Sequence, residues 1–279
     1  MSNVFADCLE AVRQKAPLVQ AITNFVTVND CANIILAAGA SPTMAHDIRE
    51  AAEIAAGAQA LVLNMGAVED AEAMVAAGLA AGRAGRPIVL DPVAAGASAL
   101  RREISARLLK ELRLTVIRGN ISEIRYLALG AAASAKGVDA AAADLVCEET
   151  LAQAADMAKA LASRSGAVIV ISGEIDIVAN PERAWIIRGG SPTMARITGS
   201  GCMLTALIGA FCGANPERPF EAAAAAVSAM NAAGELAEKR RQSLGTGTAT
   251  FRNDLIDAVS RLTAEQLIGG IRLEQYSAS

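Results

Sequence analysis

The sequence predicts an α/β fold with a mostly parallel sheet flanked by helices on both faces. Two observations carry this prediction: short runs of aliphatic and β-branched residues recur along the chain, and alanine-rich segments of helical length separate them. The composition agrees with it, because 53% of the 279 residues are hydrophobic and only 19% are charged. That is enough apolar surface for a large buried core, and it excludes a disordered chain.

Five runs are predicted as strands that are buried on both faces, as the strands of a parallel sheet are. They are residues 18–23, 60–65, 87–92, 114–119 and 167–172. The segments predicted as helices are about 28–38, 47–56, 69–84, 98–111 and 148–165. This alternation of strand and helix is typical of successive parallel crossovers.

After Ser172 the alternation ends. Residues 176–180 and 183–188, which are separated by a turn containing proline, predict an antiparallel hairpin. From Cys202 to the end of the chain, almost everything is predicted to be helical. Residues 131–147 form a weakly specified excursion, but no linker or repeat divides the chain, so we expect one domain over 1–279.

The composition excludes several functions. The 25 basic and 29 acidic residues give a net charge of −4, and with no basic block and only 3% aromatic residues a nucleic-acid partner is not expected. The single histidine, His46, excludes a multi-histidine metal site. There is no G-x-S-x-G elbow for a hydrolase and no Gly-Lys dipeptide for a P-loop.

The five cysteines are odd in number and no two are closer than ten residues, so neither a disulfide framework nor a zinc ribbon fits. They favour a reducing, cytoplasmic location. The N-terminal residues lack the apolar segment of a signal peptide. The uncharged stretch 197–216 contains an apolar run too short to cross a membrane, so we expect a buried core helix there and a soluble protein.

Polar residues follow the predicted strands at the end where parallel sheets bind ligands. Each of them alone could be a helix cap or a turn residue, but five such positions in register favour a cleft. The positions are Asn24, the Asn64 to Gly66 segment, Asp91, the Arg118 to Asn120 segment, and Ser172.

The segment Thr198–Cys202 carries two glycines and directly precedes an apolar helical run. The first N–H groups of a helix and its dipole can bind a phosphate or a developing negative charge. The alternative is an ordinary glycine-rich cap, and the residues alone do not decide between the two. The same field would favour a thiolate at Cys202, whereas a small buried hydrophobic residue is the commoner role of a free cysteine.

Asn120 and Glu123 have the spacing of a capping box at the start of a helix. Alternatively, Glu123 lies across the cleft from Asp91 and the two carboxylates hold a hydrated Mg²⁺. From the residues alone, the capping box is the preferred interpretation.

Several motifs together resemble those of bacterial hydroxyethylthiazole kinases, which belong to the ribokinase-like superfamily. They are ITNFVTVND, LVLNMG, IVLDPV, VIRGNISEI, ITGSGCM and GTGTATFRND, and the resemblance runs from about residue 15 to 262. It implies a single-domain ribokinase-like fold. It also implies that ATP phosphorylates 4-methyl-5-(2-hydroxyethyl)thiazole on its primary hydroxyl, in thiamine salvage.

The resemblance implies roles for individual residues. Gly199, Ser200 and Gly201 would form an anion hole around the transferred phosphate, and Cys202 stands where related sugar kinases have an aspartate base. Asp91 and Glu123 would organise Mg²⁺, which reverses the capping-box preference. The residues implied to contact ATP are Arg118, Ser172 and Asn120. The residues implied at the thiazole are Met44 and Gly199, with Asn24, Val26 and Gly66 nearby.

The family is trimeric with sites at subunit interfaces, so the resemblance implies a homotrimer. Two rival functions stay open at this point: another small-alcohol kinase of the same fold, such as a hydroxymethylpyrimidine kinase, and a thiazole- or nucleotide-binding protein without catalysis. A Rossmann oxidoreductase ranks last, because no G-x-G-x-x-G follows a predicted strand.

Overall fold

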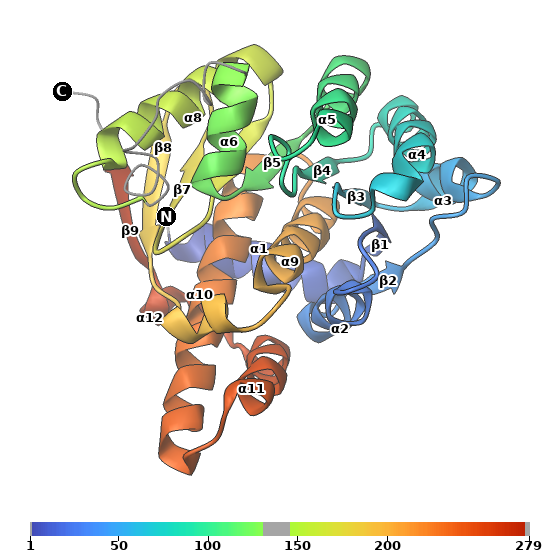
Figure 1. The fold of residues 1–279 in the computed structure, drawn as a ribbon. Coiled ribbons are helices and arrows are strands. Elements are labelled where there is room, and N and C mark those ends of the chain that lie inside the picture. The colour runs from blue at the N-terminus through green and yellow to red at the C-terminus, as the bar shows by residue number, and fades with distance from the viewer. Residues whose placement is uncertain (1, 131–145, 277–279) are drawn as a thin grey trace.

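The computed structural model describes residues 2–130 and 146–276, and these form three layers: helices, a central sheet, and helices (Figure 1). In the described residues the sheet has nine strands in the order β2-β1-β3-β4-β5-β6-β7-β8-β9. The strands are β1 (Leu18–Ile22), β2 (Ser41–Thr43), β3 (Ala60–Asn64), β4 (Ile88–Asp91), β5 (Val116–Gly119), β6 (Val168–Ile171), β7 (Ile175–Ala179), β8 (Ala184–Arg188) and β9 (Arg272–Tyr276).

The strands from β2 to β6 pair in parallel, and β6 to β9 pair antiparallel. The five predicted strands and the β7–β8 hairpin are therefore confirmed. The expectation that nearly everything after Cys202 is helical is wrong at β9, which has mostly exposed residues and no apolar alternation. Its pairing with β8, rather than a local pattern, makes it a strand. The short edge strand β2 was not predicted either.

One face of the sheet is covered by α1 (Ser2–Lys15), α2 (Val28–Ala38), α9 (Ser200–Ala214), α10 (Pro219–Leu244), α11 (Thr248–Arg261) and α12 (Ala264–Gly270). The other face is covered by α3 (Ala51–Gly57), α4 (Ala71–Arg83), α5 (Ala99–Glu111), α6 (Ile121–Leu129) and α8 (Leu151–Ser165). Short 3₁₀ turns occur at η1 (Val68–Asp70) and η3 (Pro192–Arg196). The predicted helices are confirmed within a few residues, α1 was not predicted, and most of the excursion 131–147 lies outside the described residues.

The central strands present side chains of different size to their two faces. Valines such as Val62 and Val89 pack in the core cluster beneath α9 and α10, whereas leucines and isoleucines such as Leu63 and Leu90 pack in the cluster on the opposite face. The smaller side chains let a helix approach closely. A Cβ atom on Gly209 of α9 would lie 2.4 Å from Cγ2 of Val62, so glycine is needed at this contact.

This close packing carries α9 across β3 and β4, and its first turn lies at their carboxyl ends (Figure 1). The helix has 15 residues and is buried along most of its length, as the uncharged segment 197–216 predicts. Among residues 2–130 and 146–276, no helix combines the length and the apolar character that a membrane span requires.

Candidate active site

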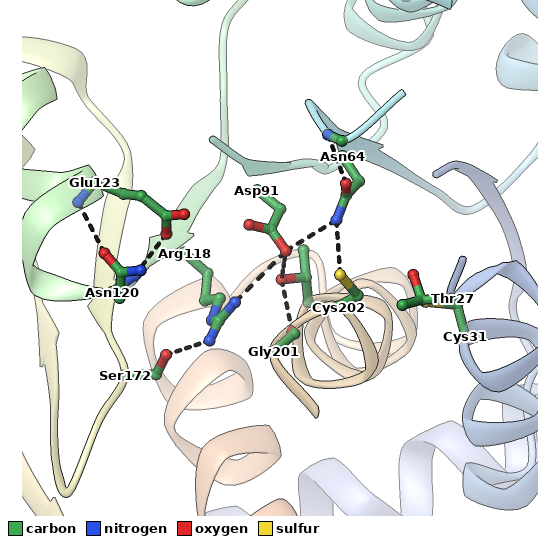
Figure 2. A network of polar contacts seen from close by, with 12 residues as sticks. Thr27, Cys31, Asn64, Asp91, Arg118, Asn120, Glu123, Ser172, Gly201 and Cys202 are labelled. Carbon is green, nitrogen blue, oxygen red and sulfur yellow. Dashed lines mark hydrogen bonds and ion pairs between the residues drawn. The ribbon is translucent and has the colours of Figure 1, made fainter. Parts of the chain in front are cut away.

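Polar side chains from the carboxyl ends of the parallel strands meet at the first turn of α9, as the sequence predicts (Figure 2). A cavity of about 520 Å³ opens beside this turn, and Arg118, Ser172, Ser200 and Gly201 form part of its wall. The helix begins at Ser200, earlier than the apolar run suggests, so the N–H groups of its first turn belong to the glycine segment itself.

Asp91, at the end of β4, is the buried acidic group of the site. Its Oδ2 atom accepts hydrogen bonds from Oγ1 of Thr205 at 2.8 Å and from Nδ2 of Asn64 at 3.1 Å. Nη1 of Arg118 lies 3.5 Å from the same oxygen. Burial raises the pKa of Asp91 to about 6, against the opposing effect of the Arg118 charge. Oδ1 is buried without a hydrogen-bond partner among the residues that the structure describes.

Cys202 is held by two side-chain amides. Nδ2 of Asn64 lies 3.2 Å from its sulfur and Nδ2 of Asn24 lies 3.5 Å from it, so both amides donate to the sulfur. Asn64 is fixed in turn, because its Oδ1 accepts hydrogen bonds from Asn24 and from the backbone N–H of Gly66. Amide donors aimed at one sulfur stabilise negative charge on it.

Three of the other cysteines lack such surroundings. Cys8, Cys31 and Cys212 are buried, and burial raises the pKa of their thiols to about 11, 12 and 12 respectively. They are the small buried residues that the sequence suggests. Cys202 is only partly buried and belongs to the polar network instead.

Two glycines bring the backbone of the α9 N-terminus close to its neighbours. Gly199 has a φ of +83°, and a Cβ there would lie 2.6 Å from Cγ2 of Thr27. A Cβ on Gly201 would lie 2.5 Å from Nη1 of Arg118. The Arg118 guanidinium therefore lies over the first turn of the helix, where it also donates a hydrogen bond to Oγ of Ser172. Neither glycine can gain a side chain unless a neighbour moves.

Asn120 and Glu123 form the capping box at the start of α6. Oδ1 of Asn120 accepts from the backbone N–H of Glu123 at 2.9 Å, and Oε2 of Glu123 accepts from that of Asn120 at 2.9 Å. Oε1 of Glu123 accepts from the N–H of Ala94 at 2.9 Å, which ties the turn after β4 to α6. A carboxylate has about four acceptor positions, so the capping role leaves Glu123 able to bind a further group. The charge of Glu123 also acts to raise the pKa of Asp91.

Two predicted substrate residues lie outside this network. Val26 is exposed, and Met44, which follows β2, is partly buried against the core. The sequence places Asn64 at the predicted cleft, as the last residue of its strand, but gives it no role. Conversely, it does not select Thr27 or Thr205. Thr205 lies one helical turn after Gly201 and carries no local signal that separates it from a core threonine.

Comparisons with known proteins agree on one family. The model of the hydroxyethylthiazole kinase family matches residues 9–265. The hydroxyethylthiazole kinase of Clostridium acetobutylicum is 48% identical over 270 residues, which are 96% of this chain and 98% of that protein. The enzyme of Desulfovibrio desulfuricans is 50% identical over 269 residues, which are 93% of this chain and 94% of that protein.

One solved structure agrees on the family, and another shares only the fold. The structure of the hydroxyethylthiazole kinase from Pyrococcus horikoshii OT3 matches with a TM-score of 0.83 and 30% identity, covering 99% of this chain and 100% of that one. A pyridoxal kinase from Staphylococcus aureus in complex with ADP matches with a TM-score of 0.55 at 16% identity. This match shows that the two proteins share a fold.

Proposed function

The chain belongs to the hydroxyethylthiazole kinase family, and from this premise we propose that it transfers the γ-phosphoryl group of ATP to the primary hydroxyl of 4-methyl-5-(2-hydroxyethyl)thiazole. The product is the thiazole phosphate used in thiamine phosphate synthesis. The fold is the ribokinase-like α/β fold. One observation supports the reaction centre most strongly: the glycine-flanked first turn of α9 faces Arg118 and the buried Asp91.

Phosphoryl transfer passes through a loose transition state, so positioning and charge neutralisation matter more than covalent chemistry. The α9 N-terminus is formed by Gly199, Ser200 and Gly201. Their backbone N–H groups, together with the helix dipole, stabilise the transferred phosphoryl group. Arg118 and Ser172 line the adjoining cavity and bind the phosphates of ATP. The guanidinium that covers Gly201 pairs with these phosphates when the nucleotide is present.

Cys202 is an auxiliary base in this proposal. Its sulfur, held by Asn24 and Asn64, accepts the proton of the substrate hydroxyl while in the thiolate form. The substrate oxygen bonds to the γ-phosphorus as the bond between that phosphorus and the β,γ-bridging oxygen breaks, and ADP is the leaving group. The loose transition state requires little proton removal before bond formation. An aspartate is therefore not essential at this position.

Asp91 and Glu123 are the residues that would hold Mg²⁺. The unpartnered Oδ1 of Asp91 fits this role, because a buried acceptor without a donor is satisfied by a cation. Asn120 holds Glu123 in place through the capping box. In the described part of the chain there is no group of three or more His, Cys, Asp or Glu side chains for a fully protein-ligated metal. A hydrated Mg²⁺ needs fewer protein ligands and neutralises phosphate charge when bound.

The thiazole binds beside Gly199, near Asn24, Val26, Gly66 and Met44. Phe25 is 82% exposed and Val26 is 57% exposed, although both adjoin a residue of the site. Exposed apolar residues of this kind are typical of an interface. We therefore include in the proposal a homotrimer in which Val26 and Met44 contribute to a site shared between subunits.

We further propose that the protein has one domain and acts in the cytoplasm. A single continuous sheet supports one kinase domain over 1–279. The five free thiols support a reducing, cytoplasmic location.

The substrate is tested by measuring ADP release from Mg-ATP with the hydroxyethylthiazole, with a hydroxymethylpyrimidine and with no acceptor. We expect release that depends on the thiazole. Release with the pyrimidine alone would keep the kinase and reject the substrate. Binding of the thiazole without release by the folded protein would instead identify a binding protein.

A further inference from the structure

A second set of side chains, separate from those assigned to phosphoryl transfer, lines the cavity beside the α9 N-terminus. Asp176 of β7 and Asn231 of α10 belong to the wall, together with the glycine pair Gly189 and Gly190. Three apolar side chains, Met194, Leu204 and Met230, line the same cavity. The cavity thus combines the phosphate-binding group around Arg118 with a second group, in which the polar pair Asp176 and Asn231 shares the wall with three apolar side chains.

Asp176 fixes the orientation of the Asn231 amide. Nδ2 of Asn231 donates to Oδ2 of Asp176 at 2.8 Å, and Oδ1 of Asp176 accepts from the N–H of Gly173 at 3.0 Å. Asn231 is 9% exposed and Asp176 is 4% exposed, so both residues are largely shielded from water. An ionised carboxylate can only accept hydrogen bonds. The amide nitrogen of Asn231 must therefore face Asp176, and its oxygen must face away.

The oxygen of Asn231 lies beside the glycine pair. A Cβ atom on Gly190 would lie 3.2 Å from Oδ1 of Asn231 and 3.1 Å from Sδ of Met194. Gly190 has a φ of +82°, a conformation that favours glycine, and its missing side chain leaves the amide oxygen accessible. Within the described residues, no donor is hydrogen-bonded to this oxygen. It is an oriented acceptor in the cavity wall, close to the side chain of Met194.

We propose that Asn231 recognises the nucleobase, its Oδ1 accepting a hydrogen bond from the exocyclic amino group of adenine, and that Asp176 is the positioning residue that holds this acceptor toward the cavity. The proposal rests on the proposed function and deepens it, because it assigns the base specificity of the same nucleotide site. Adenine offers an amino donor at its 6-position, whereas hypoxanthine has a carbonyl oxygen there. With hypoxanthine, the 6-oxo oxygen would face Oδ1 of Asn231, and neither oxygen could donate a hydrogen bond. A buried polar group left unpaired in this way weakens binding.

The test compares the binding of ADP and IDP to the full-length protein by calorimetry. We expect the wild-type protein to bind ADP at least about tenfold more tightly than IDP. Asn231→Leu removes the acceptor at similar size, and its ADP affinity is expected to fall to that for IDP. Asp176→Asn keeps the shape of the side chain, but an amide at position 176 can donate as well as accept. The Asn231 amide can then turn either its oxygen or its nitrogen toward the cavity, so the ratio of the ADP and IDP affinities is expected to approach one.

Ser228→Ala is the matched control. Ser228 lies one turn earlier on α10, and its buried hydroxyl has no hydrogen-bond partner in the described part of the chain. This variant is expected to keep the wild-type ratio. A general disturbance of α10 would lower both affinities together, whereas the proposal requires a change in their ratio.

Equal binding of ADP and IDP by the wild-type protein, an unchanged ratio in Asn231→Leu, or no binding of either nucleotide would overturn the assignment. The binding assay contains no thiazole, so its outcome is separate from that of the kinase assay. A protein that prefers ADP but does not phosphorylate the thiazole would keep this inference and reject the proposed substrate. A thiazole kinase that binds ADP and IDP equally would keep the proposed substrate and reject this inference.

Discussion

Asn64 places its side-chain nitrogen 3.2 Å from the sulfur of Cys202. The same nitrogen lies 3.1 Å from the carboxylate of Asp91, so one amide on β3 joins an acid on β4 to a thiol on α9. Because the amide donates to both, the sulfur and the carboxylate are both held as acceptors. Asn64 thus holds the Asp91 carboxylate and the Cys202 sulfur in fixed positions, although these two groups are hydrogen-bonded to the amide and not to each other.

Replacing Asp91 by asparagine tests the need for its charge. Asparagine keeps the size and can still accept from Thr205, so the fold should be preserved. Burial raises the pKa of Asp91 to about 6, so the ionised acid at pH 7 costs folding energy that the amide does not. We expect a loss of at least about 100-fold in kcat together with an unchanged or higher Tm. A variant that stays active would remove Asp91 from the proposed magnesium site.

Replacing Cys202 by alanine tests the auxiliary base. The loose transition state demands little of a base, so we expect kcat to fall by about tenfold or less. Cys202→Ser keeps a polar group between Asn24 and Asn64 and is expected to lie between alanine and the wild-type protein. If alanine abolished turnover while ATP and thiazole still bound, the thiol would be an essential base.

Replacing Gly201 by alanine tests the close approach of Arg118. The new Cβ would lie 2.5 Å from Nη1, so the guanidinium must move. Small displacements in a phosphoryl-transfer site can cost about 100-fold in rate, and we expect a loss of that order in kcat/KM for ATP. Gly82→Ala is the control, because nothing lies within 4 Å of its added Cβ in α4. It should leave activity unchanged and stabilise the protein by about 0.5–1 kcal/mol.

The stability of the protein should depend on pH through Asp176. Burial raises the pKa of its carboxyl from 3.8 to about 6, so the folded chain binds more protons than the unfolded chain between these values. The protonated Asp176 carboxyl therefore stabilises the folded state. This contribution to the unfolding free energy is complete below pH 3.8 and is lost as the pH rises through 6. Compared with Asp176→Asn, the wild-type protein should lose about 1 kcal/mol of unfolding free energy between pH 5 and pH 7. Urea unfolding curves measure this, and parallel pH profiles for the two proteins would contradict it.

Much of the fold could be predicted because its signals are local. The strands at Ala60–Asn64 and Ile88–Asp91 are apolar runs, and each ends at a residue of the site. The capping box at Asn120 could also be predicted, since both partners lie within one helical turn. β9 could not, because pairing with β8 rather than its own residues makes it a strand. Asn231 and Thr205 resemble other polar residues in core helices, and only tertiary packing brings them to Asp176 and Asp91.

The chemical fate of the γ-phosphoryl group distinguishes a thiazole kinase from an ATPase and from a protein that only binds its ligands. Phosphorus NMR can follow Mg-ATP and the hydroxyethylthiazole in the presence of the wild-type protein. We expect a phosphomonoester signal from the thiazole hydroxyl that grows one-for-one with ADP, and no such signal with Asp91→Asn over the same time. Growth of inorganic phosphate in place of the phosphomonoester, or a folded protein that leaves ATP intact, would contradict the proposal that this site is a thiazole kinase.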